Sequence, residues 1–292
     1  MAHTQPTPLA RGDVTAVAER AIAYRDLTTL DEYAAVVALE REIWGPAYDE
    51  AVPVGILKVT AERGAILVGA FAGEHLVGFV YSLRAVKGTR PIHWSHKLGV
   101  LESHRHLRIG HRLKLLQRER ALRAGVDLIE WTFDPLQAAN AHLNVAKLGV
   151  VVEDYQEEFY GASTVPVRHR GNPTDRFVVA WYIRERAVEL ALSASDSGAD
   201  ARYVETVARA NRVTMRGGLP ECSEIALDLV TSCMAIEIPT GYSDLLARAP
   251  EVAHAWRMVT RQIFTSYFRH GYRVRRFVLD LPNRKGVYLL DR

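Results

Sequence analysis

The spacing of hydrophobic and polar residues changes along the first hundred residues of the chain, and each spacing predicts a different element. Apolar residues recur at helical spacing over residues 30–44, directly after Thr28 and Thr29, which are residue types that cap helices. Two apolar runs, over 65–71 and 76–83, are joined by Ala72-Gly73-Glu74-His75 and predict an antiparallel hairpin. We further expect a flexible arm over residues 1–18, a strand over 21–27 and a short helix over 52–62.

The next segment predicts a strand, a basic turn, a helix, a second strand and a second helix, in that order. The first strand covers residues 91–100 and the second covers 126–133. Asp134 and Pro135 then occupy the positions expected for the cap and the first residue of a helix that continues to residue 148.

The basic turn after the first of these strands has the composition of an anion site. Backbone N–H groups in the first turn of a helix lack intrahelical partners, and the helix dipole adds positive potential there. Such a turn binds phosphate without requiring a particular side chain. We therefore expect backbone amides from about residue 105 to residue 112 to hold a phosphate group, with arginine side chains at the rim.

The signature Arg105-His106-Leu107-Arg108-Ile109-Gly110 in this order of elements resembles the acyl-CoA-binding motif of the GNAT superfamily of acyltransferases. The family motif is Gln/Arg-x-x-Gly-x-Gly/Ala, so Arg105 and Gly110 match it, while Arg108 stands where the first glycine is expected. A side chain at that position restricts φ and leaves open whether the turn is as tight as in the family. The resemblance covers roughly residues 20 to 165.

The resemblance implies an α+β fold, with a mixed, mostly antiparallel central sheet flanked by helices, and acetyl-CoA or another acyl-CoA, succinyl-CoA included, as the cofactor. Residues on the strand, on the turn and on the following helix would then contact the cofactor. They are Leu98, Gly99, Val100, Arg105, His106, Arg108, Ile109, Gly110, His111, Arg112 and Asn140.

The strand over 91–100 also holds the candidate base. Alternation places Trp94, His96 and Leu98 on one face and His93, Ser95 and Lys97 on the other. Bases of the family lie two or four residues before the position of Leu98, and Trp94 cannot serve, so the resemblance points to His96. The alternative is that His96 is a hydrogen-bonded histidine of the core.

The acid that would protonate the departing thiolate is absent from its usual place. The family commonly has a tyrosine five residues after the asparagine that Asn140 matches, and this chain has Val145 there. Water or a nearby side chain could substitute, or the thiolate could leave without assistance. The nearby candidates are His142, Asn144, Tyr155 and Tyr160.

The remainder of the chain predicts a second, smaller α/β unit. We place one domain over residues 19–185 and a second unit over 186–292. Its elements are strands over 233–239, 272–280 and 286–290 and a helix over 250–270. This order repeats part of the first domain, as in a degenerate half of a GNAT fold, but without a second basic glycine turn, so we expect packing or dimerisation as its use.

Composition narrows the function classes. The formal net charge of +3 and the pI near 8.8 fall short of a dedicated nucleic-acid binder, although the arginine-rich run over 104–123 keeps that alternative open. The two cysteines, Cys222 and Cys233, do not have metal-ligand spacing, and we expect no metal site. We expect no membrane-spanning segment and no signal peptide, and therefore a cytoplasmic protein.

These observations together favour an enzyme that transfers an acetyl or succinyl group from acyl-CoA to a primary amine of a small molecule, such as an amino acid. The resemblance implies direct attack by the amine in a ternary complex, and no cysteine lies near the motif to carry the acyl group. The main alternative is a GNAT-fold protein that binds CoA without turnover, which the absent tyrosine would allow.

Overall fold

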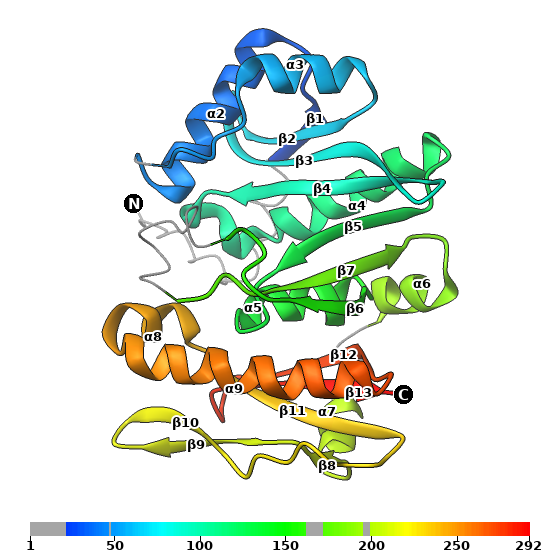
Figure 1. Ribbon diagram of the computed structural model, residues 1–292. Helices are drawn as coiled ribbons and strands as arrows, with labels where there is room; N and C mark the ends of the chain where they lie inside the picture. The colour runs from blue at the N-terminus through cyan, green and yellow to red at the C-terminus, as the bar shows by residue number, and fades with distance from the viewer. Residues whose placement is uncertain (1–21, 47, 162–171, 195–198) are drawn as a thin grey trace, which may run out of the picture. The chain divides into compact units, whose positions relative to one another are not determined.

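The computed structural model describes residues 22–46, 48–161, 172–194 and 199–292 (Figure 1). The chain divides into two compact units, 1–126 and 127–292. Both combine helices with mostly antiparallel strands, which confirms the predicted α+β class. The predicted flexible arm over 1–18 lies outside the described residues.

The described part of the first unit contains four antiparallel strands in chain order. They are β1 (Ile22–Asp26), β2 (Ile66–Ala72), β3 (His75–Lys87) and β4 (Arg90–Val100). β2 and β3 form the predicted hairpin, in which Ala72 pairs with His75 across the turn.

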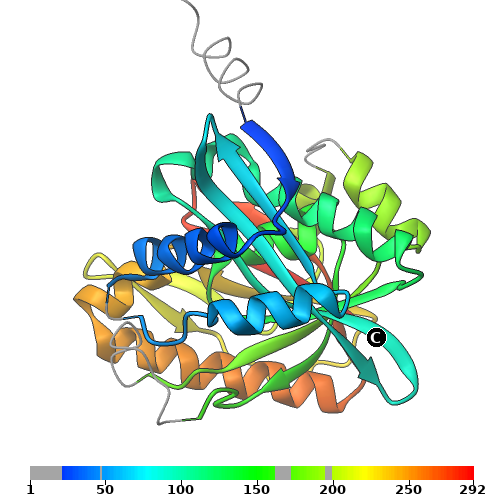
Figure 2. The same ribbon diagram turned by 90° about the horizontal axis from the view of Figure 1, so that it is seen from above.

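Helices cover both faces of these four strands (Figure 2). α2 (Leu30–Trp44) and α3 (Val54–Glu62) lie on one face, and α4 (Ile109–Arg123) lies on the other. A short 3₁₀ helix, η1 (Glu102–Leu107), joins β4 to α4.

The start of α2 shows why this segment is helical. Thr29 is the cap: its side chain accepts a hydrogen bond from the backbone of Glu32, and the Glu32 carboxylate accepts from the backbone N–H of Thr29 in return. This reciprocal capping box satisfies two donors that would otherwise lack partners. Of the two threonines that the sequence offered, Thr29 is therefore the cap, and Thr28 contributes its backbone N–H to the same carboxylate.

Apolar side chains from α2, α3 and the strands form the core of the first unit. Its fully buried members include Val36, Leu57 and Phe79. Burial of side chains of this size removes apolar surface from water and stabilises the unit by roughly 1.5–3 kcal/mol per residue.

A bulge interrupts the pairing of β3 with β4. Tyr81 pairs with Lys97 and the next residue, Ser82, pairs with Ser95, so His96 is an extra residue on β4. A bulge of this kind breaks the alternation of side chains along the strand. The prediction that Ser95 and Lys97 share a face is therefore wrong: Ser95 contacts α4, and Lys97 contacts α2.

The second unit has strands in the order β5-β7-β6-β12-β13-β11-β8 among its described residues. They are β5 (Leu128–Phe133), β6 (Val151–Gln156), β7 (Arg176–Tyr182), β8 (Ala208–Arg209), β11 (Cys233–Pro239), β12 (Arg273–Asp280) and β13 (Lys285–Asp291). Among the described residues of this unit, β8 and β11 pair in parallel, and the other neighbouring strands of this order pair antiparallel. Val152 of β6 pairs with Val274 of β12, so the predicted boundary between residues 185 and 186 falls inside this unit.

The helices of the second unit include one long helix, α9 (Pro250–Arg269), which matches the predicted helix over 250–270. The others are α5 (Ala138–Ala141), the π-helical segment η2 (His142–Lys147), α6 (Arg186–Ser193), α7 (Ala199–Val204) and α8 (Tyr242–Arg248). A separate hairpin, β9 (Arg212–Arg216) and β10 (Leu219–Ser223), was not predicted.

The helix after β5 differs from the prediction. Asp134 is not its cap, because the α-helix begins only at Ala138 and its N-cap residue is Gln137. The Asp134 carboxylate instead accepts a hydrogen bond from the backbone of Leu136 at 2.9 Å, which stabilises a turn. Asp134 therefore does accept a backbone hydrogen bond, as predicted, but the bond stabilises a turn rather than the start of a helix.

Aromatic side chains bind α9 to the strands of the second unit. Phe264 of α9 lies with its ring centroid 4.7 Å from that of Phe177 on β7 and 5.4 Å from that of Tyr288 on β13. Both contacts are edge-to-face, the geometry that aromatic quadrupoles favour.

Within the described ranges, no helix combines the length and the hydropathy needed to cross a membrane. The same residues contain no group of three or more His, Cys, Asp or Glu side chains placed to hold a metal ion.

Candidate functional site

The turn between β4 and α4 has the backbone of a tight, glycine-type turn although an arginine occupies it. Arg108 has φ 56° and ψ 19°, in the left-handed region, and it is the N-cap residue of α4. This is the conformation that glycine adopts without steric cost and other L-residues seldom adopt. The side chain of Arg108, which stands where the family motif has glycine, therefore does not prevent the backbone from forming the turn.

The first turn of α4 is open to an anion. Among the described residues no side chain of the N-cap residue caps it, and the backbone N–H of Arg112 donates to the carbonyl of Arg108 at 3.1 Å. A Cβ on Gly110 would lie 3.7 Å from Leu98 and 3.9 Å from Val100, which is ordinary contact. Because the protein's own packing does not require glycine there, the missing side chain leaves room for a ligand to approach the backbone.

Basic side chains surround this turn. Arg105, His106, Arg108 and Arg112 are all exposed. The Nε of Arg105 donates a hydrogen bond to the carbonyl of Val100 at 3.3 Å, which holds this side chain at the end of β4. Exposed guanidinium groups are donors from which phosphate oxygens commonly accept hydrogen bonds.

The remaining predicted contacts of the cofactor have mixed surroundings. Ile109 and Gly99 are buried, and Leu98, Val100 and His111 are half-buried. A Cβ on Gly99 would clash with Ile43 and Phe79 at 2.8 and 2.9 Å, so this glycine serves packing. Asn140 is exposed on α5 and belongs to the second unit.

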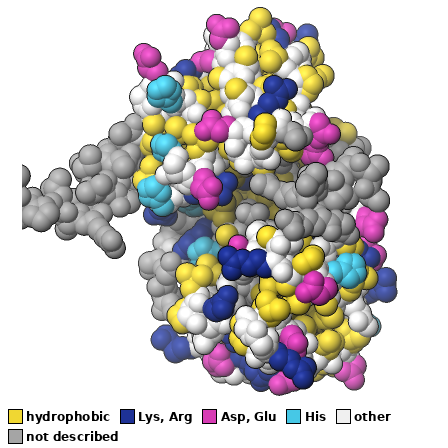
Figure 3. Space-filling model, turned by 90° about the vertical axis from the view of Figure 1, so that its left-hand side faces the viewer, with side chains coloured by type: hydrophobic (Ala, Val, Ile, Leu, Met, Phe, Trp, Pro, Cys, Tyr) yellow, Lys and Arg dark blue, Asp and Glu magenta, His cyan; other side chains and the backbone are white. Residues whose placement is uncertain are grey.

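Further along α4, several of the basic residues form ion pairs or are buried, so they do not form a continuous exposed basic surface. Arg120 pairs with Asp26, and Arg123 pairs with Glu119 at 3.5 Å. Lys114 is buried with only 2% of its surface exposed, and burial lowers its pKa well below the usual value. The ion pairs and the buried Lys114 weaken the interpretation of this helix as a nucleic-acid interface. On the face of the molecule that Figure 3 draws, acidic side chains lie among the basic ones.

His96, the candidate base, is the bulged residue of β4, and its side chain is exposed. The imidazole stands edge-on to the ring of Tyr81, with centroids 5.9 Å apart. Loss of hydration against the neighbouring protein lowers the pKa of His96, and the charge of Lys97 lowers it further. A lowered pKa keeps the imidazole neutral near pH 7, so it is able to accept a proton.

Lys97 and Glu40 form a buried ion pair beside His96. The Nζ of Lys97 lies 3.0 Å from the Glu40 carboxylate, and 8% and 0% of the two side chains are exposed. Burial raises the pKa of Glu40, although Lys97 and the backbone N–H of Val52 act against this shift. Neither side chain was singled out from the sequence, where nothing distinguishes them from other surface charges of α2 and β4.

A second buried polar cluster lies on the opposite face of β4. Lys114 donates hydrogen bonds to Ser95 at 2.8 Å and to Gln117 at 3.1 Å, and Gln117 donates to Ser95 at 3.0 Å. His93 is fully buried, with its Nδ1 3.2 Å from the hydroxyl of Ser82. His93 is thus a core histidine, and this geometry removes it as a residue that could face a substrate.

The residues that could replace the missing acid all belong to the second unit. Val145 is buried in η2, as is Asn144. Tyr155 is also buried: its pKa is raised by burial, and its hydroxyl already donates to Asp175 at 2.6 Å. Tyr160 is 44% exposed, with its hydroxyl 3.4 Å from that of Thr132, and it is the most accessible tyrosine of this group.

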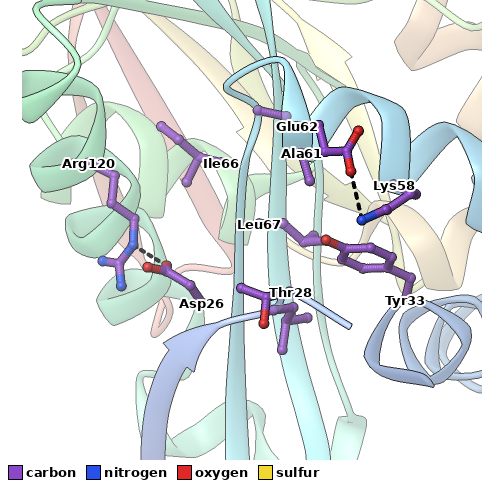
Figure 4. A pocket seen from close by; sticks show the side chains of 11 residues that line it. Asp26, Thr28, Tyr33, Lys58, Ala61, Glu62, Ile66, Leu67 and Arg120 are labelled. Atoms are coloured by element: carbon purple, nitrogen blue, oxygen red, sulfur yellow. Dashed lines mark hydrogen bonds and ion pairs between the residues drawn. The ribbon is translucent and has the colours of Figure 1, made fainter. Parts of the chain in front are cut away.

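A surface hollow of about 400 Å³ lies elsewhere in the first unit (Figure 4). Apolar side chains such as Leu67 line it, with the ring of Tyr33 beside them. Its charged side chains pair with one another: Arg120 with Asp26, and Lys58 with Glu62 at 2.7 Å. The motif residues over 105–112 do not line it.

No family model matches the sequence, and no curated protein matches it. Solved structures do resemble the chain. An acetyltransferase of the GNAT family from Streptococcus pneumoniae is 15% identical, with 55% of this chain and 97% of that one covered and a TM-score of 0.44. An aminoglycoside 6'-acetyltransferase type Ii is 21% identical over 56% of this chain and 98% of its own, also with a TM-score of 0.44.

A third structure, a protein from Salmonella typhimurium with its cofactor acetyl-CoA, is 17% identical over 61% of this chain and 99% of its own, with a TM-score of 0.45. The similarity to these three solved structures extends over 55% to 61% of the chain.

Proposed function

We propose that this protein is an acyl-CoA-dependent N-acyltransferase. The observation that carries the proposal is the left-handed backbone of Arg108 followed by Gly110, which together keep the form of a phosphate-binding turn despite an imperfect motif. The residues present fit a CoA pyrophosphate: an uncapped helix start among the described residues, space above Gly110 and exposed arginines. Acyl-CoA would supply the activated thioester.

In the proposed reaction, the turn before α4 binds the donor and His96 accepts a proton. The turn from Arg105 to Arg112 binds and orients the donor, which places the thioester for attack by an amine. A neutral His96 removes the proton from the attacking nitrogen as the new N–C bond forms and the C–S bond breaks. The thiolate leaves with the bonding electrons and takes a proton from water.

The proposed acceptor is a primary amine of a small molecule, such as an amino acid, and the proposed donor carries an acetyl or a succinyl group. The resemblance to an aminoglycoside acetyltransferase agrees with this class of acceptor without identifying it. The acceptor does not contact His93, which is fully buried.

The first experiment is a thermal-shift series with CoA, acetyl-CoA and succinyl-CoA. A ligand that binds only the folded protein stabilises it by about 2.7 kcal/mol at a hundredfold excess over Kd, so we expect an upward shift of Tm. The donor that gives the largest shift is then assayed for thiol release with a panel of amines. No shift with any of the three ligands contradicts the proposal.

Two variants locate the binding site. Gly110→Ala adds a methyl group that the fold accommodates but that would obstruct the ligand, so we expect the ligand-induced shift to fall by at least half. Gly55→Ala is the matched control, because a Cβ at Gly55 of α3 has no atom within 4 Å among the described residues. The double variant Arg105→Ala, Arg112→Ala should weaken CoA binding as well, through loss of charge.

The absence of the family's tyrosine at Val145 favours one alternative, a protein that binds CoA without acyl transfer. Binding of CoA together with no thiol release across primary amines of several classes would support this alternative. Thiol release that depends on the amine would exclude it.

A further inference from the structure

We propose that the buried Glu40–Lys97 ion pair is a positioning element for His96: it holds the bulge of β4 in place and sets the charge beside the imidazole. The catalytic role of this ion pair rests on the proposed function, in which His96 is the base. The contacts of the pair involve only α2, α3, β3 and β4 and the segment between α2 and α3, all within the first unit.

Lys97 is held from several directions. Its ammonium donates to Glu40 at 3.0 Å and to the carbonyl of Glu50 at 2.5 Å. It also lies over the rings of Trp44 at 5.5 Å and Tyr48 at 4.7 Å, at distances where a cation is attracted to an aromatic face. A lysine normally carries a flexible, hydrated charge, so this many contacts at 8% exposure indicate a fixed side chain.

Glu40 is held equally firmly on α2. One carboxylate oxygen accepts from both Lys97 and the backbone N–H of Val52, at 3.0 Å each. The other oxygen has no hydrogen-bond partner among the described residues. A buried carboxylate is costly unless it is paired, and this one depends on Lys97 for its counter-charge. The pair therefore connects α2 to the residue that follows the bulge.

The bulge is the reason why this connection matters for His96. An extra residue in one strand has no partner in the ladder, so neighbouring contacts must define its direction. On one side of His96, Lys97 is drawn toward α2 by Glu40. On the other, the Tyr81 ring that faces the imidazole is anchored to α3, because its hydroxyl lies 2.7 Å from that of Thr60.

The charges that reach His96 come from the same groups. Lys97 is adjacent in sequence and lowers the pKa of His96, while Glu40 opposes the charge of Lys97. From β3 the titratable group is Tyr81, whose pKa is raised by burial and which is therefore neutral near pH 7. Arg41 of α2 acts on Glu40 as well, and α3 contributes the uncharged Thr60.

This arrangement predicts shifts of opposite sign for the two members of the pair. Lys97→Met removes a positive charge beside the imidazole, so the pKa of His96 should rise by about 0.5 to 1 unit. Glu40→Gln leaves Lys97 without its counter-charge, so the pKa of His96 should fall by a similar amount. Lys97→Arg retains the charge and should restore the wild-type value.

The experiment measures the pKa of His96 in two ways. The first is an NMR titration of the imidazole C–H resonance, assigned with a His96→Gln variant, which requires no activity. The second is the acidic limb of the kcat/KM profile against pH in thiol-release assays. The exposed pair Lys58–Glu62 provides control variants, Lys58→Met and Glu62→Gln, for which neither readout should move.

The proposal is supported if the pKa of His96 shifts in opposite directions in Lys97→Met and Glu40→Gln, and if the acidic limb of the kcat/KM profile shifts in the same way as the NMR titration. Shifts of the same sign, or no shift in variants that fold with wild-type circular dichroism, overturn it. If Lys97→Met does not fold, the isosteric Glu40→Gln together with Lys97→Arg still decides the question. If the NMR shifts occur as expected but no acyl-CoA binds, the proposed function fails while the structural role of the pair stands.

Discussion

Asp134 and Arg257 form a buried ion pair inside the second unit, with both carboxylate oxygens 2.7 Å from the Nη2 of the arginine. Only 1% of Arg257 and 5% of Asp134 are exposed, and the guanidinium carbon lies 5.2 Å from the centroid of the Tyr242 ring. Asp134 follows β5 and Arg257 belongs to α9, so the pair joins segments more than a hundred residues apart. Neither group could be paired with the other from local sequence.

We expect Arg257→Met to destabilise the protein by about 3 to 5 kcal/mol, because it leaves the Asp134 carboxylate buried without its main counter-charge. Arg176, 3.9 Å from Asp134, can replace only part of the interaction. Urea unfolding followed by circular dichroism measures the difference. Arg269→Met, at an exposed position of the same helix, is the control and should cost less than about 1 kcal/mol.

A cost below about 1 kcal/mol for Arg257→Met would show that the pair adds no net stability. The double variant Asp134→Asn, Arg257→Met refines the test. If the two side chains stabilise each other, the double variant should lose less unfolding free energy than the two single variants lose in sum.

Arg108→Gly should stabilise the ligand-free protein by about 0.5 to 1 kcal/mol, since glycine adopts the left-handed conformation at this position without strain. Arg112→Gly is the matched control: it removes the same side chain type from the first turn of the same helix, where glycine costs about 1 kcal/mol. Thermal unfolding of both variants should therefore give shifts of opposite sign. Equal destabilisation would mean that the side chain of Arg108 contributes more than its backbone conformation costs.

The sequence predicted the elements whose signals are local. The capping threonine of α2, the hairpin of β2 and β3, and the long helix α9 depend on residues close to one another in the chain, and all three are confirmed. The basic turn was also predicted from local residues. Its conformation at Arg108 could not be, because a left-handed arginine is rare and is held by the elements on either side.

Features that depend on tertiary contacts were missed for a physical reason. Glu40 and Lys114 are charged residues on helices, where exposure is the usual state, yet partners on β4 keep both buried. The bulge at His96 leaves no signal in the alternation of polar and apolar residues, so the faces assigned to Ser95 and Lys97 were wrong. The capping signal of Asp134 was assigned to a helix because the turn and Arg257 are visible only in the fold.

The carboxylate of Glu32 should contribute stability that is lost in acid. Burial alone would raise its pKa, but the backbone N–H groups of Thr28 and Thr29 and the charge of Arg25 lower it from 4.5 to about 2. A depressed folded-state pKa adds stability that is present above pH 4.5 and is lost as the pH falls toward 2.

Glu32→Gln should therefore lower the stability of the first unit at pH 7 by about 1 kcal/mol, a value discounted for solvent screening, and flatten the pH dependence between pH 4.5 and 2. Urea unfolding at stepped pH gives both quantities. Glu74→Gln, in the exposed turn between β2 and β3, removes a carboxylate with no capping role and serves as the control. Equal effects of the two substitutions would contradict the role of the capping box.

His93 should make the first unit sensitive to mild acid in a different pH range. Burial, with a smaller effect of the charge on Arg84, lowers the pKa of His93 from 6.5 to about 4. Between these values the unfolded chain binds a proton that the folded protein does not. Stability is therefore fully present above pH 6.5 and is lost as the pH falls toward 4, by about 3 kcal/mol in total.

His93→Gln removes the titrating group but retains a polar side chain beside the hydroxyl of Ser82. We expect this variant to lose most of the slope of unfolding free energy against pH between pH 6.5 and 4, and to keep the smaller loss below pH 4.5 that Glu32 contributes. His75→Gln, at the exposed start of β3, should keep both slopes. If the wild-type protein shows no slope above pH 4.5, His93 is protonated at little cost in the folded state, and its surroundings must then admit water or an acceptor for the Nε2 proton.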